Sequence, residues 1–318
     1  MKYLITGGAG FIGSHLSEQL LATGHTITCV DNFLTGSRKN IAHLLKNSSF
    51  RLVEADCSKP LAQLDPHEVI IHLASPASPP KYQKYPIETL LVNSIGTYEL
   101  LKLAHWWQAR FMFASTSEVY GDPLEHPQKE TYWGNVNPAG PRSCYDEGKR
   151  VGEAFVYTYC TKFNLDTRVI RIFNTYGPRM DIDDGRVVTN FIAQILRKQP
   201  LTIYGDGSQS RSFCYVSDLV AGIIKVVESE KAKGETINLG NPTEHTISEF
   251  AKIIKELAHY EGELVNSKLP EDDPKLRRPD ITKAQNLLGW QPQITLTEGL
   301  KKTLAFFQNL MNGRISIL

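Results

Sequence analysis

Short runs of apolar, β-branched residues alternate with longer amphipathic segments through the first half of the chain. The short runs predict buried strands, whereas apolar residues that recur at helical spacing predict helices. The predicted strands are residues 3–5, 26–31, 50–54, 69–73, 111–115 and 167–173, and the predicted helices are residues 13–23, 86–107 and a segment around Tyr145. This alternation indicates a parallel sheet that is covered by helices.

The alternation becomes irregular after residues 174–179. Beyond this point the pattern predicts helices at residues 188–197, 217–229 and 248–259 and a strand at residues 236–239. We interpret this part as a smaller lobe that is interleaved with the last elements of the sheet. Residues 121–143 form a long predicted loop rich in proline and glycine, and loops of this length in compact domains are often functional.

The composition is that of a globular chain with a small-molecule partner. Of the 318 residues, 41% are hydrophobic, and the net charge of +1 argues against nucleic acid or an anionic membrane as the partner. No apolar stretch approaches the length of a membrane span. Five scattered cysteines without a C-x-x-C pair argue against a disulfide framework and a zinc site, so we expect no metal. Because no signal-peptide pattern opens the chain, we expect a cytoplasmic protein.

Glycines recur at every third position between the first predicted strand and the first predicted helix. Gly7, Gly10 and Gly13 have no side chains to keep a pyrophosphate away from the helix N-terminus. A plain strand-to-helix turn is the alternative, but the flanking strand and helix are the context that a dinucleotide fingerprint requires. Asp31 ends the second predicted strand, where a carboxylate can accept hydrogen bonds from ribose hydroxyls and repel a 2′-phosphate. The sequence therefore favours NAD over NADP.

Two further polar residues lie in or near the predicted strands: the role of Asp56 is left open, and His72 is interpreted as a structural residue. Asp56 follows the third predicted strand, where it either holds an adenine amino group or forms a turn. His72 lies inside a strand that reads as buried, so we expect a hydrogen-bonded core imidazole rather than a catalytic group.

Tyr145 and Lys149 are four residues apart and therefore share one face of a predicted helix. We expect the lysine to lower the pKa of the phenol, which makes Tyr145 a candidate base, although most pairs at this spacing are only surface neighbours. Thr116 and Glu118 lie just past the end of a predicted strand, at the sheet edge where ligands bind. Their side chains can bond to a sugar oxygen and relay a proton, while the alternative for Thr116 is a helix cap.

Arginines are frequent in the loop-like segments of the second half. Their guanidinium groups suit a diphosphate or a carboxylate, and we expect two or three of the five to touch a ligand. The five are Arg179, Arg186, Arg211, Arg277 and Arg278. Tyr204, beside Gly205 and Gly207, either stacks on a base or packs between lobes.

Longer strings in the chain are more specific than these motifs. They lie at residues 30–33, 72–80, 115–123, 132–138, 144–150, 171–179 and 184–188. Through them, and along nearly its whole length, the chain resembles the extended short-chain dehydrogenase/reductases that act on nucleotide sugars, most closely the UDP-glucuronate decarboxylases, also called UDP-xylose synthases. The resemblance implies an α/β fold: a modified Rossmann, doubly wound parallel sheet with a smaller C-terminal lobe. It implies an NAD-binding domain at residues 1–175 that carries the catalytic residues, a lobe at residues 176–312 that mainly binds the nucleotide sugar, and a tail at residues 313–318.

The resemblance also implies roles for individual residues. NAD is expected to be reduced and reoxidised within one turnover, with Tyr145 as the base, Lys149 orienting it, Thr116 bonded to O4 of the sugar and Glu118 assisting near C5. The implied cofactor-binding residues are Gly7, Gly10, Phe11, Ile12, Gly13, Asp31, Asn32, Phe33, Thr35, Gly36, Asp56, Cys57, Leu73, Ala74, Ser75, Tyr145 and Lys149. The implied UDP-sugar residues are Pro76, Asn174, Arg179, Arg186, Val187, Tyr204, Arg211 and Arg277. A homodimer through the helices that begin near Pro86 and Tyr145 is also expected.

One position departs from the family pattern. Leu91 stands where the decarboxylases carry a lysine, which weakens the prediction of a glucuronate carboxylate and makes a 4-epimerase of another nucleotide sugar the first alternative. A 4,6-dehydratase is less favoured because Ser117, rather than an aspartate, precedes Glu118. A binding module without turnover is the alternative from another class, and the four intact candidate catalytic residues argue against it.

Overall fold

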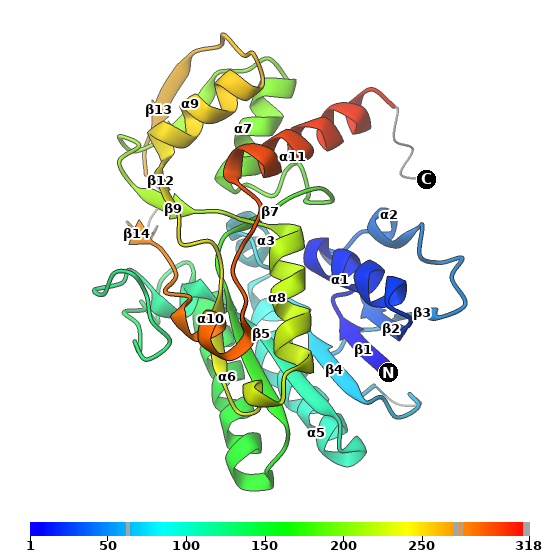
Figure 1. Ribbon diagram of the computed structural model, residues 1–318. Helices are drawn as coiled ribbons and strands as arrows, with labels where there is room; N and C mark the ends of the chain where they lie inside the picture. The colour runs from blue at the N-terminus through cyan, green and yellow to red at the C-terminus, as the bar shows by residue number, and fades with distance from the viewer. Residues whose placement is uncertain (62–63, 270–273, 275, 314–318) are drawn as a thin grey trace.

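The computed structural model describes residues 1–61, 64–269, 274 and 276–313, and a seven-stranded sheet lies at its centre (Figure 1). The strands lie in the order β11 (Thr236–Leu239), β6 (Thr167–Ile172), β5 (Arg110–Thr116), β4 (Val69–His72), β1 (Lys2–Thr6), β2 (Thr26–Asp31) and β3 (Phe50–Glu54). Each strand is parallel to its neighbours, which confirms the predicted parallel sheet. The strand order reverses between β1 and β4, and sheets of this kind bind ligands at such a point, beyond the carboxyl ends of their strands.

Helices cover both faces of the sheet (Figure 1). One face carries α1 (Phe11–Ala22) and α8 (Val216–Glu228), and the other carries α5 (Thr97–Trp107) and α6 (Ser143–Phe163). Strand periodicity explains the two cores: Tyr3 and Ile5 of β1 pack into the first, and Leu4 between them packs into the second. The sheet is therefore buried on both sides, as its continuous apolar strands predict.

The segment predicted as one helix over residues 86–107 is divided in the structure. A π-helical turn, η1 (Val92–Gly96), joins α4 (Pro86–Leu91) to α5. Asn93 in this turn is fully buried, and its Nδ2 donates to Thr89 O and to Ser75 Oγ, both at 2.9 Å. The turn thus connects the helix to the loop after β4, and π turns of this kind often lie at functional sites.

Two glycines set how closely α6 approaches the sheet and the π turn η1. A Cβ at Gly152 would lie 2.4 Å from Cζ of Phe113 on β5, and one at Gly148 would lie 3.3 Å from Cβ of Asn93. A side chain at residue 152 would push the helix outward. Gly152 therefore helps to fix the height of α6, and with it of Tyr145, above the strand ends.

The smaller lobe lies at one end of the sheet, in the upper part of Figure 1. It contains α7 (Val187–Leu196), α9 (Ile247–Leu257), α11 (Leu296–Met311), and β8 (Leu201–Tyr204) paired with β13 (Leu264–Ser267). Buried aromatic side chains hold it together: the ring of Phe250 stacks on Phe213 at 4.6 Å and on Phe191 at 5.7 Å between centroids. α8 and β11 follow the start of this lobe in sequence but lie on the main sheet.

Short elements join the two parts. The small sheets are β9 (Ser210–Ser212) with β12 (Glu244–Thr246) and β14 (Leu276–Arg277), and β7 (Thr175–Tyr176) with β10 (Cys214–Tyr215). The remaining helices are α2 (Arg38–Ile41), α3 (Pro79–Lys84), η2 (Ser117–Tyr120), η3 (Glu230–Ala232) and α10 (Thr282–Leu288). The hydrophobic pattern predicted α7, α8 and α9 but missed α3, α10 and α11, and residues 314–318 of the expected tail lie outside the described residues.

Within the described residues, none of the helices has the length and hydropathy to span a membrane. All five cysteines are free, and four of them are buried. The described residues form no cluster of histidine, cysteine and acidic side chains that could hold a metal ion.

Candidate active site

The glycine-rich turn between β1 and α1 is packed so tightly that side chains are excluded from it. Gly7 has a φ of +72°, and a Cβ there would lie 2.7 Å from Ala74 N. A Cβ at Gly13 would lie 2.2 Å from Gly7 O. The turn therefore depends on both glycines, and it delivers the first residues of α1 to the switch point of the sheet.

Asp31, at the end of β2, lies directly beside this turn. Its Oδ2 accepts from Ala9 N and its Oδ1 accepts from Phe33 N, both at 2.9 Å. Burial raises the pKa of Asp31, and the two backbone hydrogen bonds oppose this effect. A Cβ at Gly36 would lie 2.7 Å from Asp31 Oδ1, so the loop after β2 folds back over the carboxylate.

A cavity of about 960 Å³ extends from the glycine-rich turn to the smaller lobe. The expected site residues that line it are Gly7, Gly10, Phe11, Ile12, Gly13, Thr35, Gly36, Leu73, Ser75, Thr116, Glu118, Tyr145, Lys149, Asn174, Arg179, Arg186, Val187, Tyr204, Arg211 and Arg277. The described lining does not include Asp31, Asn32, Phe33, Asp56, Cys57, Ala74 and Pro76. The fold thus brings expected catalytic, cofactor-binding and UDP-sugar residues together at one cavity, although they come from segments far apart in sequence.

Tyr145 and Lys149 lie on the buried face of α6, as their spacing predicts. The Tyr145 side chain is hydrogen-bonded to Thr116, at the end of β5. Lys149 Nζ donates to Ala114 O at 2.7 Å and lies 5.8 Å from the centroid of the Tyr145 ring. Thr116 also accepts from Glu118 N at 3.2 Å, so its hydroxyl serves both as the expected cap and as a partner of the phenol.

The electrostatics of this pair differ from the expectation. Burial raises the pKa of Tyr145 above its usual value, against the effects of the hydrogen bond with Thr116 and of the Arg186 charge. Burial also lowers the pKa of Lys149 from 10.5 to about 7. The predicted lowering of the phenol pKa by Lys149 is wrong for this structure, because both groups lose their hydration and each then favours its neutral form.

Glu118 lies between two arginines from distant parts of the chain. Arg142 Nη2 donates to its Oε2, and Arg277 Nη1 donates to its Oε1 at 3.2 Å. Burial alone would raise the pKa of Glu118, but the Arg277 and Arg142 charges outweigh burial and bring it to about 2. The carboxylate is therefore ionised, oriented from both sides and open to the cavity.

The sequence interpretation missed Arg142 and Tyr82, which both line the cavity. The Tyr82 ring stacks on the Tyr145 ring with centroids 5.1 Å apart and planes 6° apart. Its hydroxyl is buried and finds no hydrogen-bond partner among the described residues. Arg142 stands three residues before Tyr145 and could have been found from that spacing, whereas nothing in the local sequence marks Tyr82.

The arginines of the second half are distributed unevenly around the cavity. Four of the five candidates line it, and Arg278 is absent from its described lining. Arg277 is 1% exposed, and its Nη2 donates to Gly121 O at 2.9 Å. Arg179 forms an ion pair with Glu18 on α1, so its guanidinium is already engaged with the protein.

The two ambiguous residues have structural partners. Asp56 Oδ1 accepts from Ser58 N at 2.9 Å and from Ser58 Oγ at 2.7 Å, as a turn-forming aspartate does. His72 is 1% exposed and bonded to Thr6 Oγ1 at 2.7 Å, and burial lowers its pKa to about 3. His72 is thus the core imidazole that the sequence predicts.

Comparison with known proteins agrees with this geometry. The family described as GDP-mannose 4,6 dehydratase matches residues 4–303. UDP-glucuronic acid decarboxylase 1 of Xenopus tropicalis is 52% identical over 308 residues, which cover 96% of this chain and 72% of that protein. This chain belongs to the UDP-glucuronic acid decarboxylase family. UDP-glucuronic acid decarboxylase 2 of Arabidopsis thaliana is 51% identical, with 98% and 69% of the two chains covered, and the resemblance inferred from the motifs is confirmed.

Solved structures extend the comparison of this decarboxylase-family chain to epimerases. UDP-glucose 4-epimerase of Thermotoga maritima, in a structure with UDP-glucose, superposes with a TM-score of 0.90 at 30% identity and covers 98% of this chain and 100% of its own. UDP-glucuronic acid 4-epimerase of Bacillus cereus, in complex with UDP-glucuronic acid and NAD, has a TM-score of 0.86 at 30% identity and the same coverage. The modified Rossmann fold is therefore confirmed.

The departure from the decarboxylase-family pattern at Leu91 lies away from this site. Leu91 ends α4 with 43% of its surface exposed, and the described lining of the cavity does not include it. Leu91 itself is therefore not part of the described cavity wall.

Proposed function

We propose that this chain converts UDP-glucuronate to UDP-xylose and carbon dioxide with an internally recycled NAD. The observation that carries the proposal is the meeting of Tyr145, Lys149, Thr116 and Glu118 in the cavity that begins at the glycine-rich turn. The chain is also about half identical, over nearly its whole length, to proteins named for this activity.

The residues around the glycine-rich turn fit a dinucleotide. No described side chain caps the N-terminus of α1, so the first N–H groups of this twelve-residue helix remain available to a pyrophosphate. Phe11 and Ile12, in that first turn, line the cavity. Asp31 would accept from the ribose hydroxyls, and its carboxylate would repel a 2′-phosphate, which supports NAD rather than NADP.

NAD bound here would supply the acceptor for a hydride from C4 of the sugar and the donor that returns it. Tyr145 would take the proton from the O4 hydroxyl, with Thr116 bonded to the same oxygen. Above about pH 7 the Tyr145–Lys149 pair holds one titratable proton, which lies on the phenol. Burial brings the pKa of Lys149 to about 7 and raises that of Tyr145. A phenolate beside an ammonium holds the same number, so a proton shift within the pair produces the base without exchange with solvent.

Glu118 and its two arginines would act at C5. A ketone at C4 is β to the C5 carboxylate, so the C5–carboxylate bond can break with its electron pair moving into an enolate while carbon dioxide leaves. C5 must then take up a proton before the hydride returns to C4. Glu118 is held in position by Arg142 and Arg277, and it would orient the group that delivers this proton.

The second half of the chain would hold the rest of the substrate. We assign the UDP portion to Asn174, Arg186, Tyr204, Arg211 and Arg277, all of which line the cavity. Arg179 and Val187 line it as well and are assigned to the same ligand. In this assignment residues 1–175 carry the NAD site and the catalytic groups, and residues 176–312 mainly bind the nucleotide sugar.

We also propose a homodimer that forms through α4 and α6. Apolar side chains are exposed on the first of these helices and on the turn that follows: Ile87 at 62%, Leu90 at 38% and Ile95 at 43%. Size-exclusion chromatography with light scattering should give the mass of two 35.7 kDa chains, and Ile95→Glu should halve this mass. Leu264→Glu, at an apolar position with 41% exposure in the smaller lobe, is the control that should leave it unchanged.

A cytoplasmic location is part of the same proposal. Its support is the free state of all five cysteines, which suits a reducing compartment. Fractionation of the source cells should place the protein with the cytoplasmic markers.

The direct test is incubation of the purified protein with UDP-glucuronate and NAD. Carbon dioxide is measured together with the sugar product by NMR. UDP-xylose with carbon dioxide is the expected result. UDP-galacturonate without carbon dioxide would identify a 4-epimerase instead, an alternative that the likeness to the Bacillus cereus enzyme keeps open. Retained NAD without any product would contradict the proposal and return the binding-module alternative.

A further inference from the structure

Residues 177–186, between β7 and α7, form a loop along one side of the cavity, which we call the lid loop. Its residues on the cavity wall are Arg179, Met180, Asp181, Ile182, Asp184, Gly185 and Arg186. The start of the loop is held against α1. His15 Nε2 donates to Pro178 O at 2.9 Å, and Arg179 pairs with Glu18.

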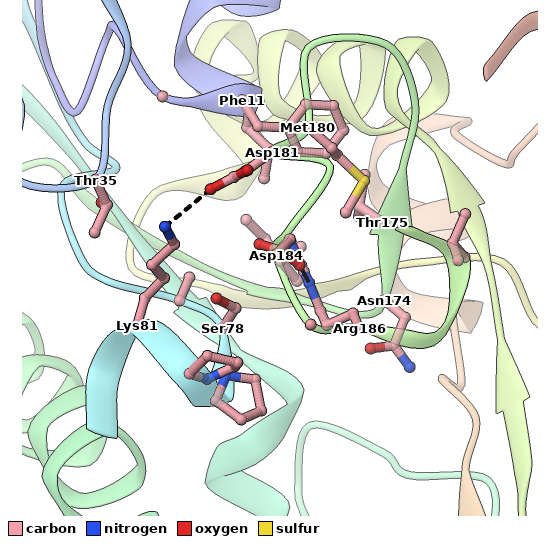
Figure 2. A pocket seen from close by; sticks show the side chains of 18 of the residues that line it. Phe11, Thr35, Ser78, Lys81, Asn174, Thr175, Met180, Asp181, Asp184 and Arg186 are labelled. Atoms are coloured by element: carbon pink, nitrogen blue, oxygen red, sulfur yellow. Dashed lines mark hydrogen bonds and ion pairs between the residues drawn. The ribbon is translucent and has the colours of Figure 1, made fainter. Parts of the chain in front are cut away.

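The middle of the lid loop meets α3 from the opposite side of the cavity. Lys81 Nζ on α3 lies 2.9 Å from Asp181 Oδ2, and Figure 2 shows the two side chains pointing toward each other between Thr35 and Phe11. Lys81 lines the cavity as Asp181 does, so the ion pair lies on the cavity wall rather than on a remote surface. It joins a segment that follows β4 to a segment that begins the smaller lobe.

A second contact brings the same two segments together. Gly185 has a φ of +85°, and a Cβ there would lie 2.5 Å from Cγ of Pro80 in the first turn of α3. The loop backbone therefore lies directly on the proline ring. Beyond this contact Arg186 pairs with Asp184 inside the loop, and Figure 2 shows its side chain on the Asn174 side of the cavity.

The ion pair is of a kind that can break and re-form. The Lys81 and Asp181 side chains are 32% and 44% exposed, so solvent and salt screen their attraction. Such a pair changes an equilibrium by about fivefold at most. It can therefore bias the lid loop toward the closed arrangement without preventing ligands from entering or leaving.

We propose that the Lys81–Asp181 ion pair closes the lid loop over the cavity and slows the release of the ligands beneath it. This inference rests on the proposed function, because a reaction that removes a hydride from C4 and later returns it needs both the ketosugar and the reduced cofactor to stay in place. The pair supplies that retention, and it contacts none of the candidate catalytic residues directly.

The test measures dissociation rather than turnover. NADH is bound to the purified protein and displaced by excess NAD, and the fall of its fluorescence gives the release rate; UDP release is measured by competition. Lys81→Met and Asp181→Asn should each release both ligands about two- to fivefold faster than the parent. Asp181→Asn keeps the oxygen that accepts from Asp183 N at 3.0 Å, so the loop retains its turn.

Two further variants make the result specific to the pair. The exchanged variant Lys81→Asp/Asp181→Lys restores the attraction but loses the oxygen that accepts from Asp183 N, so its release rates should lie between those of the parent and those of Lys81→Met. Lys283→Met breaks an ion pair of similar exposure, 31% and 39%, between Lys283 and Glu235 outside the cavity, and it should leave the rates unchanged. Higher salt should speed release from the parent more than from Lys81→Met, because only the parent has this ion pair to screen.

Equal release rates in the parent, Lys81→Met and Asp181→Asn would overturn the lid proposal, whatever the enzyme does with UDP-glucuronate. A salt effect on release that is the same in the parent and in Lys81→Met would overturn it too. Since neither rate requires chemistry at the sugar, the absence of UDP-xylose would count against the proposed function alone.

Discussion

Lys149 offers a sharp test of the electrostatics of the site, because it is a lysine almost entirely removed from water. Its side chain is 3% exposed, and burial lowers its pKa from 10.5 to about 7. Between about pH 7 and pH 10.5, the lysine carries an extra proton in the unfolded chain that it has already lost in the folded protein. The folded protein is therefore destabilised by Lys149 at low pH, and this cost falls as the pH rises from 7 toward 10.5.

The size of the effect follows from the two pKa values. The depressed pKa of Lys149 lowers the free energy of unfolding by about 5 kcal/mol at pH 6 and by about 2 kcal/mol at pH 9. Lys149→Met removes this cost and also removes the hydrogen bond to Ala114 O, whose loss is the same at both pH values. Relative to the parent, the variant should therefore be more stable at pH 6 than at pH 9 by about 3 kcal/mol.

The measurement is urea unfolding of the ligand-free parent and variant at both pH values, followed by circular dichroism and tryptophan fluorescence. Differences between the two proteins cancel the titration of all other groups that behave alike in both. Lys301→Met, which removes an exposed lysine on α11, is the control and should show no dependence on pH. A stability difference between Lys149→Met and the parent that is the same at pH 6 and pH 9 would refute the assignment of a depressed pKa.

Three further variants test other parts of the structure. Tyr145→Phe should lower decarboxylation by about a thousandfold, since it removes the base, while the NAD content measured after denaturation stays that of the parent; turnover at the parent rate would contradict the assigned role. Gly13→Ala places a Cβ 2.2 Å from Gly7 O and should be purified without NAD, and a full complement of cofactor would show that the turn tolerates a side chain. Gly152→Ala places a Cβ 2.4 Å from Phe113 Cζ and should cost about 1–3 kcal/mol in urea unfolding, so unchanged stability would mean that α6 can shift without cost.

Much of the fold could be predicted because its elements carry local signals. The strands of the main sheet are apolar runs bounded by turn residues, and the helices between them repeat apolar residues at helical spacing. The pattern failed where the backbone departs from regular geometry or where apolar residues are shared with distant partners. The π turn at Val92–Gly96 interrupts a segment whose spacing still reads as helix, and Asn93 makes up for the interruption with its own hydrogen bonds.

In the candidate site too, some residues could be predicted from local spacing and others could not. Tyr145 and Lys149 share a helix face, and Thr116 and Glu118 follow one strand, so short-range spacing was enough to select them. The partners of these residues come from elsewhere. Arg277 reaches Glu118 across 159 residues of chain, and Tyr82 stacks on Tyr145 from the segment after β4.

Local sequence was enough to predict the parallel α/β sheet, the glycine-rich turn and the residue types at the ends of its strands, because helix and strand periodicities are properties of neighbouring residues. The charge states in the cavity depend instead on how the chain folds. The spacing placed an ammonium four residues from a phenol and suggested a lowered pKa for Tyr145. In the structure, burial raises the pKa of Tyr145 and lowers that of Lys149. Hydration depends on everything packed around a side chain, and for Lys149, Glu118 and Lys81 those surroundings are assembled from segments that meet only when the chain has folded.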